Sequence, residues 1–148
     1  MDAVFAGNPE FNQAMKQWIE SRIWDDGSTL PPSVMMGVFD KGKIVAAVAF
    51  HDYHEKEGVI EISAASESKR WLTRNVLHAI FSYVFVTAKC QLCVARIEPE
   101  NTSLLRIFKA YGFNDIRIPR LLGREKDQIV LTLTDDDWLA NKFERKAA

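Results

Sequence analysis

The stretch NTSLLRIFKAYGF, residues 101–113, decides the fold. Asn101 is a strong helix N-cap, because its side chain can accept a hydrogen bond from a free backbone N–H of the first turn. Gly112 ends the helix, and Phe113 supplies the apolar contact of a Schellman end. Between the two ends, apolar residues recur at helical spacing: Leu104, Ile107, Phe108 and Tyr111. The stretch predicts a short helix with one buried face.

On either side of this helix the chain alternates between strand and helix patterns. A first helix opens at Asn8-Pro9, and the longest one is predicted from about Lys69 to Thr87, with one apolar stripe facing a sheet. Residues 51–58 are polar and predict a solvated loop. The expected strands are residues 33–39, 43–50, 59–65, 90–97, 114–120 and 128–133, and a last short helix is capped by Thr134. No linker interrupts this order, so residues 1–148 predict one domain.

Composition excludes several classes of protein. The formal net charge of the 148 residues is −1, so no broad electrostatic surface for nucleic acid or an anionic membrane is expected. The chain has no apolar run near the roughly 20 residues that span a bilayer. We therefore expect a soluble, cytoplasmic protein that binds neither nucleic acid nor a membrane.

Two groups of residues suggest a metal at first sight. Cys90 and Cys93 have C-x-x-C spacing, but no second pair completes a zinc site and the surrounding run is apolar. We interpret them as buried structural thiols. His51 and His54 lie in the polar segment 51–58, which we expect to line an acceptor site. No metal is predicted.

The order of elements together with residues 101–113 resembles the GNAT superfamily of N-acetyltransferases, in which an Asn opens this helix and a Gly-Phe pair follows it. The resemblance runs from about residue 33 to residue 133, and the segments 61–63 and 70–74 look most like small phage- or prophage-borne members. It implies an α/β (α+β) fold. The sheet would be mixed and mostly antiparallel, with helices on both faces and a cleft where the fourth and fifth strands splay apart.

The same resemblance implies transfer of an acetyl group from acetyl-CoA to a primary amine by direct attack. Strand alternation puts the Glu61 carboxylate in the middle of a sheet, which costs free energy unless it is paired or faces a wet cleft. Relatives often place a general base on this fourth strand, and an ammonium of pKa about 10.4 must lose a proton before it attacks. Glu61 is the expected base; the alternative is a salt bridge with Arg96.

The start of the long helix is the expected site for the CoA pyrophosphate, because free N–H groups there bind anions. In the alternative interpretation its cations only solvate a helix face. The sequence also departs from the family pattern: Ser68 stands in the usual Arg or Gln place, and Lys69, Trp71 and Thr73 stand where glycines are usual. The residues expected to bind acetyl-CoA are Ile62, Ser63, Ala64, Ser66, Lys69, Arg70, Trp71, Leu72, Thr73, Arg74, Asn101, Ser103 and Arg106.

Three questions stay open at this point. Many relatives have a Tyr general acid where this chain has Phe108, and we interpret nearby Tyr111 as a core aromatic. Tyr53 is expected near the acceptor, which could be a protein N-terminus, a lysine, a polyamine or an antibiotic. The sequence leaves open a homodimer, and also a degenerate scaffold that binds acyl-CoA or a protein without turnover.

Overall fold

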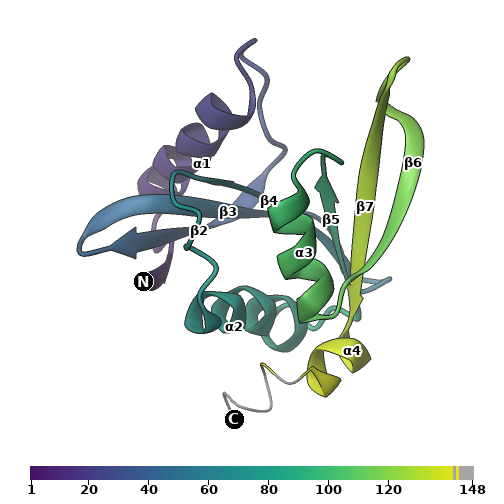
Figure 1. Ribbon diagram of the computed structural model, residues 1–148. Helices are drawn as coiled ribbons and strands as arrows, with labels where there is room; N and C mark the ends of the chain where they lie inside the picture. The colour runs from purple at the N-terminus through teal and green to yellow at the C-terminus, as the bar shows by residue number, and fades with distance from the viewer. Residues whose placement is uncertain (142, 144–148) are drawn as a thin grey trace.

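A seven-stranded sheet with the order β1-β2-β3-β4-β5-β7-β6 forms the centre of the protein. The computed structural model describes residues 1–141 and 143 (Figure 1). All neighbouring strands are antiparallel except β4 and β5, which are parallel. The strands are β1 Asp2–Phe5, β2 Ser33–Asp40, β3 Lys43–His54, β4 Val59–Ser66, β5 Leu92–Ile97, β6 Asn114–Gly123 and β7 Lys126–Thr134.

Helices cover both faces of this sheet. The helix α1 (Pro9–Ile23) packs on one face, where Met15 and Ile19 meet alternate residues of β2 and β3. The helices α2 (Arg74–Ser82), its π-helical continuation η1 (Tyr83–Thr87), α3 (Thr102–Tyr111) and α4 (Asp135–Ala140) contribute to the larger core on the other face. The predicted mixed sheet with helices on both faces is confirmed. Among the described residues no helix is long and apolar enough to cross a membrane.

The strands β4 and β5 stop pairing halfway along β4. Their pairing runs from Val59 opposite Leu92 to Ile62 opposite Ala95, whereas β4 continues to Ser66. β5 stays paired with β7 along all of its residues. Figure 1 shows the result: β5, β7 and β6 run steeply away from β2, β3 and β4. The predicted splay between the fourth and fifth strands is confirmed.

The long helix begins later than its apolar periodicity predicts. It was expected from about Lys69, but α2 begins at Arg74, and the Thr73 hydroxyl accepts a hydrogen bond from the Val76 N–H at 3.4 Å. The segment before it is a loop, in which Ser66 Oγ accepts a hydrogen bond from the Ser68 N–H at 2.9 Å. Serine side chains compete in this way for backbone groups that a helix would need.

The polar segment after Phe50 is a strand and not a loop. β3 continues to His54 because β4 pairs with it, with His51 opposite Glu61 and His54 opposite Val59. A bulge interrupts the register between His51 and His54. The expected solvated loop was therefore wrong for its first half: His51 is only 5% exposed.

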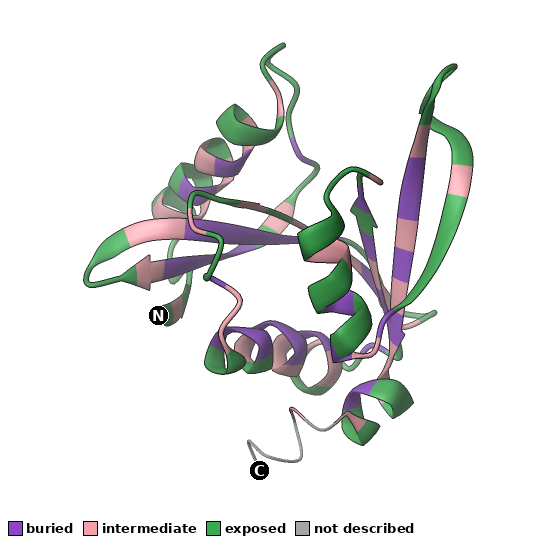
Figure 2. Cartoon of the chain, viewed as in Figure 1, coloured by how far each residue is buried: buried purple, intermediate pink, exposed green. Residues whose placement is uncertain are grey.

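The strand β6 forms one free edge of the sheet. Figure 2 shows it exposed along almost its whole length, while the adjacent β7 is mostly buried or intermediate. β7 contributes Ile129, Leu131 and Leu133 to the core that β5 shares with the helices, and β6 extends the sheet beyond it.

Replacing Thr73 by alanine tests where α2 begins. The variant loses the N-cap and should lower the free energy of unfolding by about 1 kcal/mol in urea denaturation. Lys69→Ala serves as the control, since Lys69 precedes the helix and its loss should change the same quantity by less than about 0.5 kcal/mol. Equal effects of the two substitutions would contradict the observed helix start.

Candidate active site

A groove of about 610 Å³ opens at the carboxyl end of β4. It is built by four segments: the end of α1, the end of β4, the loop before α2 and the start of α3. Of the residues expected to bind acetyl-CoA, the structure brings together here Ala64, Ser66, Lys69, Trp71, Leu72, Asn101 and Ser103. Trp71 lines this groove although it is only 6% exposed and belongs to the core.

The other residues of that set lie outside the groove. Ile62 and Ser63 are deeper along β4, Thr73 caps α2, and the guanidinium of Arg74 lies over the Phe143 ring at 5.7 Å. Arg70 and Arg106 are exposed and do not line the groove. Lys69, Arg70 and Arg74 are the cations expected to meet the pyrophosphate, and of these three Lys69 alone lines the groove.

The groove also contains an ion pair that the sequence did not predict. Arg22, near the end of α1, donates from Nε to Glu67 Oε1 at 2.9 Å and stacks over the Trp18 ring at 3.7 Å. Both partners line the groove. They are 45 positions apart, and only the packing of α1 against the end of β4 brings them together. A basic residue in the last turn of α1 was the only signal available in the sequence.

Successive residues of β4 point their backbone N–H and C=O groups alternately toward β3 and toward the β5 side. Glu67 N–H donates to Val45 O at 2.8 Å, and the antiparallel register then turns Ser63 and Ala65 toward β3 as well. The backbone groups of Ala64 and Ser66 consequently point to the β5 side, where strand pairing has ended. Only alternate N–H groups of the expected run 62–66 face the opening.

Glu61 lies where β4 is still paired, with its side chain on the α1 face of the sheet. The carboxylate is 19% exposed and its Oε2 lies 3.3 Å from Nε of Arg96 on β5. The salt bridge that competed with the catalytic interpretation is thus present. Because the Arg96 side chain is 45% exposed, solvent screens the pair and it contributes little stability.

A second polar group borders Glu61 on the same face. His51 shares hydrogen bonds with Ser63 Oγ through Nε2 at 2.7 Å and with Asp52 Oδ2 through Nδ1 at 2.5 Å. One polar atom each of His51, Asp52 and Glu61 lie within 4.8 Å of one another. Each ring nitrogen of His51 has an oxygen atom as its hydrogen-bond partner. The sequence missed this group because it placed His51 in a loop.

The aromatic residues near α3 belong to the core. Tyr111 is 1% exposed, and its hydroxyl accepts a hydrogen bond from Trp138 Nε1 at 3.0 Å. The interpretation of Tyr111 as a core aromatic is confirmed. Phe108 stacks on Phe113 with ring centroids 4.9 Å apart. Neither Phe108 nor Tyr111 lines the groove.

Tyr53 lies apart from Glu61. Its hydroxyl donates to the carbonyl oxygen of Ala88. Ala88 follows η1, on the face of the sheet that α2 covers, and Glu61 points to the α1 face. The structure therefore does not bring these two expected site residues together.

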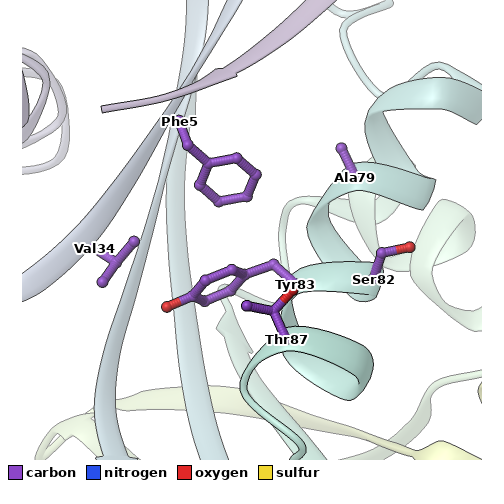
Figure 3. A pocket seen from close by; sticks show the side chains of 6 residues that line it. All are labelled: Phe5, Val34, Ala79, Ser82, Tyr83 and Thr87. Atoms are coloured by element: carbon purple, nitrogen blue, oxygen red, sulfur yellow. The ribbon is translucent and has the colours of Figure 1, made fainter. Parts of the chain in front are cut away.

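A second hollow, of about 510 Å³, lies between the β1–β2 side of the sheet and α2 with η1. Figure 3 shows the Phe5 and Tyr83 rings entering it, with Ser82 and Thr87 along the helical side. Burial raises the pKa of the Tyr83 phenol, so this hydroxyl stays protonated near neutral pH and is no base. The hollow is apolar and lacks the acid, base and anion-binding groups of the groove at β4.

The family model of the acetyltransferase (GNAT) domain matches residues 2–114 of this chain. The chain belongs to the GNAT acetyltransferase family. This match extends over β1 to the start of β6 and so includes β4, the groove and α3. The comparison does not separate phage-borne members from others, and that finer resemblance stays a prediction. A search of curated proteins found no relative that matches this GNAT chain.

Solved structures share its architecture at low sequence identity. A variant of the spermidine N-acetyltransferase SpeG from Vibrio cholerae is 13% identical, with a TM-score of 0.65 over 88% of this chain and 78% of that one. A GCN5-related N-acetyltransferase from Brucella melitensis is 21% identical, with a TM-score of 0.64 over 78% and 57%. A ribosomal-protein-S5-alanine acetyltransferase from Vibrio fischeri is 18% identical, with a TM-score of 0.62 over 72% of this chain and 63% of that one. At these identities the likeness shows a common fold.

The two cysteines should be unreactive in the folded GNAT domain. Both are buried, and burial raises the pKa of the Cys90 thiol and, more strongly, of the Cys93 thiol. At pH 8 less thiolate is then present than in an ordinary cysteine, and the thiolate is the reactive form. A colorimetric disulfide reagent should detect no thiol in native protein and both thiols in urea. Immediate reaction of either thiol in native buffer would contradict their structural role.

Proposed function

We propose that this GNAT domain transfers an acetyl group from acetyl-CoA to a primary amine, with Glu61 as the general base. The observation that carries the proposal is that Glu61 lies on the same strand, β4, whose carboxyl end forms a wall of the groove. Three residues of extended chain, about 10 Å, separate Glu61 from the groove wall at Ala64. A pantetheine arm lying on the open edge of β4 would end beside the carboxylate.

The groove supplies contacts suited to the rest of the cofactor. Lys69 offers a positive charge to phosphate, and Asn101 and Ser103 offer polar groups at the start of α3. Trp71 occupies a place where relatives have glycine, but it is packed in the core while its neighbours Lys69 and Ser68 line the groove. This arrangement supports cofactor binding without the usual glycines, and it removes one reason for regarding the domain as a scaffold without turnover.

The reaction follows from these positions. A bound ammonium group gives a proton, through one water molecule, to the Glu61 carboxylate, and the neutral amine then attacks the thioester carbonyl. The N–H groups on the open edge of β4, that of Ala64 among them, stabilise the negative oxygen of the tetrahedral intermediate. Collapse of the intermediate breaks the C–S bond, the second amine proton passes to solvent, and the CoA thiolate leaves. No acetyl group becomes attached to the enzyme.

The acceptor we propose is a small cationic amine. A carboxylate oxygen of Glu61 and one of Asp52 lie within 4.8 Å of each other, and Arg96, which pairs with Glu61, offsets only one of the two negative charges. One structural neighbour is named as a spermidine N-acetyltransferase, which makes polyamines the first class to assay. Peptide N-termini, lysine side chains and aminoglycosides are the comparison classes.

Calorimetric titration with acetyl-CoA tests cofactor binding directly. We expect a Kd in the micromolar range and an approximately tenfold weaker Kd for Lys69→Ala, since a charge-assisted contact to phosphate contributes about 1.4 kcal/mol or more. Lys56→Ala, at the exposed turn between β3 and β4, is the charge-matched control and should bind like the wild type. Absence of binding to the wild type would contradict the proposed function.

Substitution of the proposed base tests the chemistry. Glu61→Gln preserves shape but cannot accept the proton, so kcat should fall at least about 100-fold while the Kd for acetyl-CoA stays within about twofold. Glu10→Gln, an exposed change in the first turn of α1, is the matched control. Unchanged turnover in Glu61→Gln would show that Glu61 is only the partner of Arg96.

A further inference from the structure

A continuous chain of hydrogen bonds leads from Ser63 on β4 to the protein surface. Ser63 lies on β4, at the first position beyond the last β4–β5 pair, and its Oγ is 2.7 Å from His51 Nε2. The other ring nitrogen of His51 is 2.5 Å from Asp52 Oδ2. His51 is 5% exposed, whereas the Asp52 side chain is 53% exposed. This chain of hydrogen bonds therefore has one end at Ser63, just beyond the last β4–β5 pair, a buried imidazole in the middle and one end in solvent.

The backbone of β3 is distorted at Asp52, the last residue of this hydrogen-bonded series. Consecutive residues of a regular strand point to opposite faces, so a regular β3 would turn Asp52 away from His51. Asp52 instead has φ +51°, beside the bulge between His51 and His54. A positive φ is uncommon for a residue with a side chain, and such distortions often aim a side chain at a functional site. Here the distortion directs the Asp52 carboxylate to the buried imidazole.

We propose that Ser63, His51 and Asp52 form the proton exit of Glu61, a proposal that rests on the proposed function. The proton that Glu61 takes from the amine passes through one water molecule to Ser63 Oγ, and the Ser63 hydroxyl proton moves to His51 Nε2. The Nδ1 proton of His51 moves to Asp52, which releases it to solvent. One proton enters at Glu61 and one leaves at Asp52, so Glu61 is a carboxylate again for the next turnover.

The surroundings of His51 fit this role. The charged groups near it are Asp52 on its own strand and Glu61 on β4, with Arg96 of β5 beyond Glu61. Its register partner on β2 is the uncharged Ser33. Glu61 is 19% exposed before any substrate lies over it, so a bound acetyl-CoA and acceptor leave it little direct contact with bulk water. An imidazole accepts at one nitrogen while it donates at the other, which suits it to pass a proton onward near neutral pH.

The test compares substitutions of two residues of the hydrogen-bonded series, His51 and Ser63, with a control substitution of another histidine, His78. His51→Gln and Ser63→Ala should each lower kcat about 10- to 100-fold, with the KM for acetyl-CoA and for the amine within about twofold. Ser63→Ala removes a single hydroxyl and covers the case in which His51→Gln folds poorly. His78→Gln changes an exposed histidine on α2, on the opposite face of the sheet, and should behave like the wild type.

Two further measurements separate proton transfer from a structural role. Imidazole added to the buffer should restore turnover of His51→Ala in proportion to its concentration, because it supplies the missing proton carrier. The solvent deuterium isotope effect on kcat should be larger in Ser63→Ala than in the wild type. Asp52→Asn keeps a hydrogen-bond acceptor but not a proton acceptor, and should lower kcat.

The wild-type assay distinguishes the two ways of failing. A wild-type protein that acetylates no amine would contradict the proposed function and, with it, the proton exit. An active wild type with unaffected His51→Gln and Ser63→Ala variants would overturn the proton exit alone. Loss of activity that imidazole does not restore, accompanied by a lower Tm, would also overturn it and make His51 a structural residue. A stable acetyl group on Ser63, detected by intact mass, would assign the serine a different role.

Discussion

The end of pairing between β4 and β5 is the constraint on which the rest of the site depends. β5 must stay with β7 along its whole length, and it therefore leaves β4 after the pair Ile62–Ala95. A parallel pair that ended later would satisfy the β4 main chain with β5 and leave no edge for a ligand. The groove, the exposed N–H groups and the access to Glu61 all follow from this early separation.

The segment after β4 shows how a GNAT groove can form without glycines. Ser66 and Ser68 hold each other in a tight turn, and Trp71 places its large side chain in the core. Thr73 then caps α2, which leaves the residues between as a loop along the groove. Glycine normally provides close backbone approach by having no side chain. Here the large Trp71 side chain is instead packed in the core.

The polar face around Glu61 combines two strands that have different local patterns. On β4 the alternation of charged or polar residues with apolar ones was visible in the sequence. On β3 the residues from His51 onward are polar without alternation, which is typical of a loop. Pairing with β4 nevertheless extends the strand, buries His51 and imposes the bulge at Asp52. Cross-strand hydrogen bonds outweighed the local preference.

The sequence by itself determined the order and type of nearly every element, the helix caps at Asn101 and Thr134, and the identity of Glu61 as a carboxylate inside a sheet. These features depend on periodicity and on hydrogen bonds over three or four residues, so they are local. Tertiary structure alone decided the Arg22–Glu67 pair, the alternate N–H groups that face the cleft and the environment of His51. Those features join segments many residues apart, and only the packing of the complete core fixes which side chains meet.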